Sequence, residues 1–514
     1  MDKSDGRTKI PPVRESLLGP AGLALAAVLV LCVVAPPEIR GSGLAATAFF
    51  VCVAVVAASA TAAASPASRW VFAMVPLGLV AIRTAIAPGE AVEPAVCMLL
   101  AAFAGISAAH AAEHDEFFAW LFGALAAYAG GRALFAGYSG LKPSGAAALS
   151  GFLIMTLPAV AAWALGKRGR TRALGLAAGA LGAGGLVATR SVPAIAALAA
   201  ALALAGLRGR VVPRTLAVGT AAFGLAVLGV GIARPDANVR AALEIARDHP
   251  LAGVGPGGFA EAFPQYRSSG DDESRHANDL PAELAAEWGV PVGLALSAVF
   301  FWLFVGPVVR RENDAFTLSS GLKVGVAAFA LHNLAGLTAF LPSLLVCAAV
   351  CRGLLARRVA RDRAVPAERA AWVAIALALA VVAAGSGLAR DALSDARDKA
   401  ASGDHAAALR LALLASALAP WDADPPLFAC GRRMAAGSSV TAALEDAERA
   451  VERAPSQASA RSVRARARSA AGDSTGAYAD LVEASRLDPL RAEYASQRDA
   501  LAAALVRAGE AAPR

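Results

Sequence analysis

Long apolar blocks separated by short polar connections fill most of the 514-residue chain. A helix that crosses a bilayer needs about 20 consecutive apolar residues, and about 13 blocks approach that length. Those before residue 233 run near 17–35, 43–64, 70–87, 91–112, 117–137, 144–165, 173–189, 191–207 and 214–232; those after it run near 284–308, 317–339, 341–356 and 370–388. The pattern predicts an all-α fold that begins as a polytopic transmembrane helical bundle of about 13 spans.

Two polar stretches interrupt the apolar pattern and divide the chain. Residues 1–16 form a tail, 17–232 hold spans 1–9, and 233–283 form a long polar loop. Residues 284–388 hold spans 10–13, and 389–514 are polar and repetitive. With 57% hydrophobic residues, the chain is too apolar for an ordinary soluble enzyme. Its six cysteines show neither a disulfide framework nor the spacing of metal ligands.

The basic residues lie mainly in connections that the span count places on one side. They cluster in the N-terminal tail and at 166–172, 208–210, 310–312 and 352–363. Because Lys and Arg mark cytoplasmic loops, the net charge of +8 reports topology and not nucleic-acid binding. The N-terminus then lies inside, while the polar loop and everything after residue 388 lie outside the cytoplasm. The acidic connection 113–116 also falls inside, although it contains no cation.

Small residues recur with a regular period in the C-terminal part. Pro420, Pro455 and Pro489 are 35 and 34 residues apart, and alanine pairs precede each proline at matching positions: Ala408 and Ala415, Ala443 and Ala450, Ala477 and Ala484. Gly403 and Gly472 align, whereas the middle unit has Ser438 with Gly437 beside it. This is the tetratricopeptide period, so we predict an α-solenoid of three units with 490–508 as a capping helix. The alternative is an alanine-rich bundle with an accidental period.

Two segments of the polar loop contain residue types suited to ligand binding or catalysis. The first, "EIARDHPLAGVGPGGFAEAFPQYR", predicts a short amphipathic helix that ends at His249-Pro250, followed by glycines at 253, 255, 257 and 258. Such glycines expose amides that can wrap a phosphate, but the spacing of a nucleotide loop is absent.

The second segment is "SRHANDLPAELAAEWG", at 274–289. Pro281 suits the first turn of a helix, whose positive end would lie near His276, Asn278 and Arg275. A histidine there can exchange a proton near neutral pH; the alternative is a histidine that merely caps the helix. Glu283 and Glu287, one turn apart, either order the site or lie on a solvated face.

Two residues of the apolar part bear on this site. Arg190 lies at the outer junction of two nearly continuous blocks, where a charge is expensive unless it serves a partner. The alternative is an arginine that only extends its charge to the interface. His332 lies inside an apolar block, and we expect a hydrogen-bonded structural role for it.

These residues resemble the signature of the O-antigen ligase and polymerase superfamily of bacterial membrane glycosyltransferases. The resemblance is carried by "DHPLAGVGPGGF", "YR", "HAND" and "AEWG" in the loop, by "TRS" at 189–191, and by "LHNLAGLTAFLP" in a late helix. Some members of this superfamily carry an added tetratricopeptide tail, which matches the repeats at 389–514. The sequence departs from the family pattern where Gly336 replaces an acidic residue, and where either Arg234 or Arg240 stands for an arginine ahead of the loop motif.

The resemblance implies transfer of a glycan from an undecaprenyl diphosphate carrier to an acceptor hydroxyl, outside the cytoplasm and without a metal or cofactor. His276 is then the base or the orienting group for that hydroxyl, and Asn278 positions the histidine or a sugar. Arg190, with Arg267 or another loop arginine such as Arg240 or Arg275, holds the diphosphate. The expected location is the bacterial inner membrane, with the polar loop and the repeats outside the cytoplasm.

Other readings of the sequence remain open. The acceptor is a glycan, a lipid or a protein, so the chain is either a ligase or a polymerase that extends a lipid-linked glycan. A non-catalytic envelope scaffold that acts through its repeats is a further alternative. We expect deletion of 392–514 to weaken engagement of a partner or acceptor while the chemistry is retained.

The topology is directly testable at residue 270. We expect a cysteine introduced as Gly270→Cys to react with a membrane-impermeant thiol reagent added to intact cells from outside, with the unsubstituted chain as the control. Labelling only after the cytoplasm is opened would overturn the predicted orientation.

Overall fold

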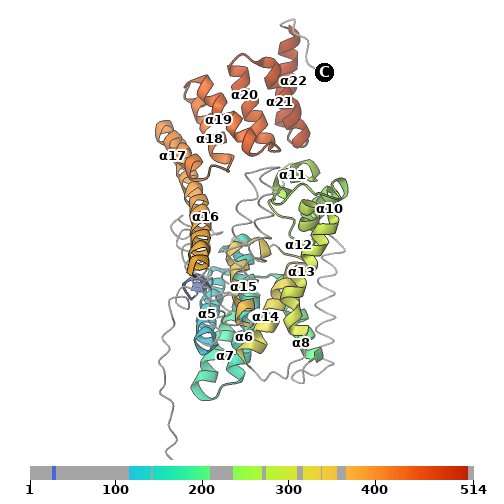
Figure 1. Ribbon diagram of the computed structural model, residues 1–514, viewed down its shortest axis with the longest axis vertical. Coiled ribbons are helices and arrows are strands. Elements are labelled where there is room, and N and C mark those ends of the chain that lie inside the picture. The colour runs from blue at the N-terminus through green and yellow to red at the C-terminus, as the bar shows by residue number, and fades with distance from the viewer. Residues whose placement is uncertain are drawn as a thin grey trace, which may run out of the picture.

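The computed structural model describes residues 26–30, 115–140, 143–208, 236–268, 274–309, 317–336, 338–355 and 366–507. Within these ranges every regular element is a helix and no strand occurs, which confirms the all-α prediction (Figure 1). The predicted blocks at 43–64, 70–87, 91–112 and 214–232, and most of 17–35, lie outside the described residues.

Seven helices of the described part form the apolar bundle: α5 (Asp115–Gly140), α6 (Pro143–Leu165), α7 (Gly169–Ala188), α8 (Val192–Arg208), α13 (Val290–Val309), α14 (Leu318–His332) and α15 (Pro342–Leu355). Four stretches of the described residues are long and apolar enough to cross a membrane by length and composition: Asp115–Ala136, Gly145–Leu165, Gly169–Ala188 and Val290–Val309. Val192–Gly206, Leu318–His332 and Ser343–Leu355 are shorter apolar helices. The predicted block 317–339 corresponds to a shorter helix, α14, which ends at His332 with Asn333 as its C-cap.

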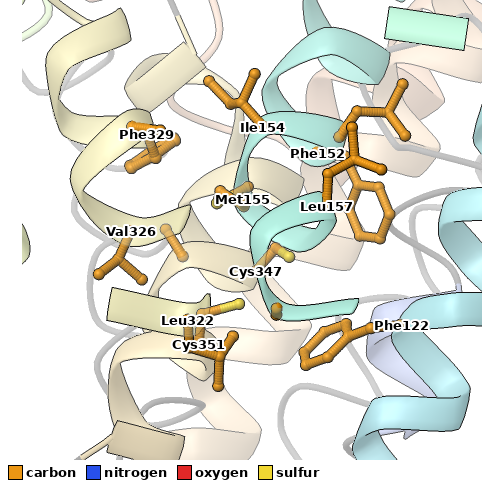
Figure 2. Packing of buried hydrophobic residues seen from close by; sticks show 14 of the residues in the cluster. Phe122, Phe152, Ile154, Met155, Leu157, Leu322, Val326, Phe329, Cys347 and Cys351 are labelled. Atoms are coloured by element: carbon orange, nitrogen blue, oxygen red, sulfur yellow. The ribbon is translucent and has the colours of Figure 1, made fainter. Parts of the chain in front are cut away.

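Helix α6 lies at the centre of this bundle. Figure 2 shows its side chains between α14 and α15, with Phe122 of α5 beside them. The labelled residues of the cluster are Phe122, Phe152, Ile154, Met155, Leu157, Leu322, Val326, Phe329, Cys347 and Cys351. Helix α14 approaches α6 so closely that a Cβ at Gly325 would lie 1.9 Å from the Met155 carbonyl oxygen. Only glycine at that position allows the contact.

The predicted span at 284–308 is wrong in its first part. The chain there forms two helices, α12 (Leu280–Trp288) and α13, because Gly289 has a φ of 77° and breaks the helix. Helix α12 instead belongs to the polar loop, where α10 (Ala237–Asp248) and α11 (Phe259–Tyr266) pack on it. Their shared core includes Ile245, Phe259, Phe263 and Ala286.

The glycine run of the loop binds the end of α12. The amides of Val254 and Gly255 donate to the carbonyls of Ala286 and Glu287 at 2.9 and 2.8 Å, and the Val290 amide donates to the Pro250 carbonyl at 2.8 Å. These bonds satisfy carbonyls that a helix end leaves without partners. The run therefore has a structural task in the fold, where the sequence alone left phosphate binding open.

One ion pair at the surface joins the start of α5 to the turn after α6. Lys167, in the turn between α6 and α7, binds the carboxylate of Glu116 in the first turn of α5. The acidic connection without a cation and the basic connection 166–172 thus lie on the same side of the bundle, as the span count predicted.

The C-terminal part begins with one continuous helix. Helix α16 (Pro366–Ala401) runs through the predicted boundary at residue 388 without a break and packs on α17 (His405–Leu418). The remaining helices are α18 (Asp424–Ala435), α19 (Val440–Arg453), α20 (Ala458–Ala470), α21 (Ser474–Leu487) and α22 (Ala492–Arg507), stacked in antiparallel order (Figure 1).

The repeat positions have the predicted packing. The six alanines that recur with the period are at most 1% exposed: Ala408, Ala415, Ala443, Ala450, Ala477 and Ala484. Gly403, Gly437 and Gly472 all have positive φ before the second helix of their unit. Gly437 therefore fills the position that Ser438 seemed to hold by alignment, and the middle unit has one more residue between this glycine and its next helix.

We predict that Gly289→Ala destabilises the loop. Its Cβ would lie 2.3 Å from the Leu251 carbonyl oxygen, and its positive φ alone costs about 1–3 kcal/mol for a residue with a side chain. The midpoint of thermal unfolding of the detergent-solubilised protein should fall. The matched control is Gly306→Ala in α13, where a Cβ meets nothing within 4 Å, so its midpoint should stay or rise slightly. Equal midpoints for the two variants would contradict this account.

Candidate functional site

Three segments distant in sequence meet at one end of the bundle. They are the segment 274–279 with the start of α12, the end of α14, and the 3₁₀ helix η2 (Thr338–Phe340). The Leu280 amide donates to the Asn333 carbonyl at 2.9 Å, which joins α12 to α14. Asp279 begins α12 by accepting a hydrogen bond from the Ala282 amide at 2.8 Å. Asp279 is therefore the N-cap of α12, and His276 does not cap this helix.

His276 is bound by Glu283. The two atoms His276 Nδ1 and Glu283 Oε1 are 2.8 Å apart, and Glu283 Oε2 accepts the Ala277 amide at 2.7 Å. The Glu283 carboxylate thus holds both the ring and the backbone that follows it. Its side chain is 2% exposed, whereas that of His276 is 36% exposed. Burial raises the pKa of the Glu283 carboxyl, and the hydrogen bonds from His276 and Ala277 oppose that rise.

The ring of His276 also has a packing partner. Phe340 stacks on it with ring centroids 4.8 Å apart and an interplanar angle of 16°. An ionised Glu283 carboxylate can only accept a hydrogen bond, so Nδ1 of His276 must be the donor. The neutral imidazole therefore carries its proton on Nδ1, and Nε2 keeps a lone pair. A fixed tautomer, a fixed ring plane and partial exposure are what a general base requires.

A buried polar network holds Phe340 in place. The side-chain oxygen of Asn333 accepts from the Thr338 hydroxyl at 3.2 Å and from the Ala339 amide at 2.6 Å, and its nitrogen donates to the Phe329 carbonyl at 2.8 Å. His332 Nδ1 lies 3.1 Å from the Thr338 hydroxyl oxygen. Because the hydroxyl gives its one proton to Asn333, His332 is the donor toward it. This agrees with the structural role expected for His332.

Arg190 lies at the same end of the bundle as this network. The turn 189–191 joins α7 to α8 and is therefore at the opposite end of α7 from Lys167. Helix α14 runs antiparallel to α6: Gly321 meets Pro158, and a Cβ at Gly151, in the N-terminal half of α6, would lie 2.9 Å from Thr338. The network therefore also lies toward the end remote from Lys167. Arg190 is exposed there and has a φ of 52°. Such a conformation is costly for a residue with a side chain and is often found at functional sites.

The other predicted residues have different surroundings. Arg240 is exposed on α10, and Arg275 is exposed beside His276. Asn278, with a φ of 59°, donates to Asp236 at 3.3 Å. Asn278 therefore ties the segment to the start of α10. Of the two roles that the resemblance implies, its side chain binds Asp236 and not His276, and contact with a sugar stays a prediction.

Arg267 is placed differently from the expectation that it holds a diphosphate. Its Nη2 donates to both carboxylate oxygens of Asp488 in the repeats, at 2.7 and 3.0 Å. The side chains are 3% and 7% exposed. A guanidinium used in this way is not presented to a ligand.

Sequence reasoning only half found two functional residues. Glu283 was weighed against a solvated face, and the deciding signal was available: Asp279 caps the helix, so Glu283 follows in its first turn, facing the preceding segment. Phe340 belongs to the late motif, but the sequence assigns it no role. Nothing in the sequence brings it to His276 across 64 residues, because that contact depends on how α14 packs.

No cluster of three or more His, Cys, Asp or Glu side chains suited to a metal ion occurs among the residues that the structure describes.

Comparisons with known proteins add little to this geometry. No protein-family model matches the chain, and no curated protein does. One matching solved structure is described as the first TPR of Spaghetti (RPAP3) bound to HSP90 peptide SRMEEVD; the match is 20% identical, covers 24% of this chain and 98% of that chain, and has a TM-score of 0.23. The repeat assignment therefore rests on the period and on the buried alanines.

We predict that Glu283→Ala loosens the segment before α12. It leaves the Ala277 amide without its acceptor, a loss of about 1–3 kcal/mol that corresponds to roughly 5- to 150-fold more local opening. Trypsin should then cut after the exposed Arg275 correspondingly faster. Glu283→Gln keeps one acceptor oxygen and should show a smaller increase. Unchanged cleavage in both variants would show that the carboxylate does not order this segment.

Proposed function

We propose that the protein is a membrane glycosyltransferase that moves a glycan from an undecaprenyl diphosphate carrier to an acceptor hydroxyl, in the manner of O-antigen ligases. The observation that carries the proposal is the His276–Glu283 pair, with Nδ1 bound at 2.8 Å to a buried carboxylate and the histidine side chain 36% exposed. The sequence motifs around it supply the reaction class. In this proposal the protein is a multi-pass protein of the bacterial inner membrane with about 13 spans. The four described helices that are long and apolar enough to cross a bilayer support a membrane location.

The proposed step uses His276 as a base toward the acceptor. The acceptor oxygen forms a bond to the first carbon of the glycan while the bond from that carbon to the phosphate oxygen breaks. Nε2 of His276 takes the proton of the acceptor hydroxyl, and undecaprenyl diphosphate leaves with the electron pair. Glu283 stabilises the positive charge that develops on the ring, as a buried carboxylate does in other histidine bases.

The leaving diphosphate needs cations beside it. Guanidinium groups bind phosphate oxygens through two parallel hydrogen bonds, and they stabilise charge that develops on the leaving group. Arg190 suits this role because it lies at the His276 end of the bundle in an unusual backbone conformation. Arg275 and Arg240, both exposed on the loop, are the candidates for the second cation in place of Arg267.

The alternative functions, polymerase and scaffold, differ from the ligase in whether an acceptor binds at His276 and in which acceptor it is. A polymerase uses the same step with a lipid-linked glycan as the acceptor, and the geometry favours neither acceptor. The buried Glu283 carboxylate also orients a partly exposed histidine, and this second task supports chemistry at this place over a scaffold.

The decisive test is His276→Ala in cells, with chain level and membrane insertion confirmed. Loss of a general base typically lowers a rate about 10²- to 10⁴-fold, so surface glycan should be lost and its lipid-linked precursor should accumulate. Glu283→Gln should cause the same change in a weaker form.

The matched control is His249→Ala. His249 is an exposed histidine of the same loop, and its backbone donates to the Ile245 carbonyl and accepts from the Gly253 amide. Its replacement should leave product and precursor at their normal levels. Normal product from the His276→Ala chain would remove the catalytic role and leave the scaffold reading.

A further inference from the structure

The last repeat touches the polar loop. Helix α11 packs against α21, and each helix ends at a residue of the buried ion pair: Arg267 is the C-cap of α11 and Asp488 is the C-cap of α21. The two residues are 221 positions apart, and the pair is enclosed by both parts of the chain. The side chains of Tyr266 on α11 and Arg486 on α21 are also close enough to interact electrostatically. Figure 1 shows α20–α22 above α10 and α11.

Asp488 departs from its own repeat pattern. The residue before each repeat proline is the C-cap of the preceding helix: Ala419, Ala454 and Asp488. The three have nearly the same backbone, with φ from −141° to −127° and ψ of 78° or 79°, and all are buried. Packing between repeats is therefore satisfied by alanine at this position, so it does not explain the aspartate in the third unit.

A carboxylate is badly placed at this position unless a cation compensates it. The C-terminal end of a helix carries partial negative charge, and burying an ion without a partner is expensive. Arg267 supplies the compensation with two short hydrogen bonds, and a cation is itself well placed at the end of α11. Inside the solenoid the carboxylate has a longer contact, with Arg491 Nε at 3.9 Å, whereas its two short hydrogen bonds come from the loop through Arg267.

The pair stands close to the candidate site in sequence. Arg267 precedes His276 by nine residues, and it fixes the end of α11 from which the chain continues toward the histidine. The solenoid is in turn attached to the membrane part through the continuous helix α16. The repeats are therefore held at both ends, covalently through α16 and by the Arg267–Asp488 pair at α21.

We propose that the solenoid docks on the polar loop of its own chain through Arg267 and Asp488, and that this docking positions the segment bearing His276 for transfer. Arg267 and Asp488 are positioning residues in this proposal, which rests on the proposed function for its second half only. Removal of the repeats should therefore impair the chemistry itself, in contrast to the separable role that the sequence suggested.

The test is a charge exchange in the full-length protein: Arg267→Asp, Asp488→Arg, and both together. Hydrogen exchange of the α11 amides measures docking, and formation of glycan product measures positioning. Removing one partner of a buried pair should raise opening of α11 roughly 10²-fold or more and lower transfer, whereas the double exchange should recover much of both. The control is Arg498→Asp on α22, whose exposed pair with Asp499 should not affect either measurement.

Several results would overturn the proposal. Unchanged exchange in both single variants would show that the pair does not hold the docking. Raised exchange with normal transfer would show that docking does not position His276. Restored transfer when the Arg267→Asp and Asp488→Arg chains are produced together would place the contact between two chains. If the His276→Ala chain still makes product, the proposed function fails, and the exchange measurements continue to decide the docking.

Discussion

The candidate site depends on the burial of one carboxylate. Glu283 is almost fully enclosed and still accepts two hydrogen bonds, from the ring of His276 and from the Ala277 amide. A buried acceptor without these partners would be costly, so the segment before α12 is held in the one arrangement that supplies both. The tautomer of His276 and the plane of its ring follow from that arrangement.

Packing between α14 and α6 in the apolar bundle supports this arrangement. Helix α14 reaches α6 closely because its glycines remove the side chains that would separate the two backbones. That packing sets where α14 ends, and the buried amide of Asn333 then organises the turn that carries Phe340. The ring of Phe340, after the end of α14, and the ring of His276 in the polar loop are thereby stacked, so the geometry of the site is shared between two segments of the fold.

The repeats are joined to the same loop by a second buried charge pair. Arg267 and Asp488 illustrate how a residue can be assigned the right chemistry and the wrong partner from sequence. An arginine in the polar loop suits a diphosphate, but a guanidinium binds a carboxylate equally well, here through Nη2 to both oxygens of Asp488. Which anion it meets depends on a residue 221 positions away, and no local pattern reports that.

The sequence by itself determined the all-α class, the repeat period with its buried alanines, the end of α10 at His249, and the helix that begins near Pro281. These features depend on hydrophobic periodicity, turn residues and caps, which act over a few residues. Only the tertiary structure decided that Gly289 splits a predicted span, that Phe340 lies on His276, and that Asp488 binds Arg267. Each of those depends on close approach between distant segments, where backbone contact and the cost of burying charge select one partner from many.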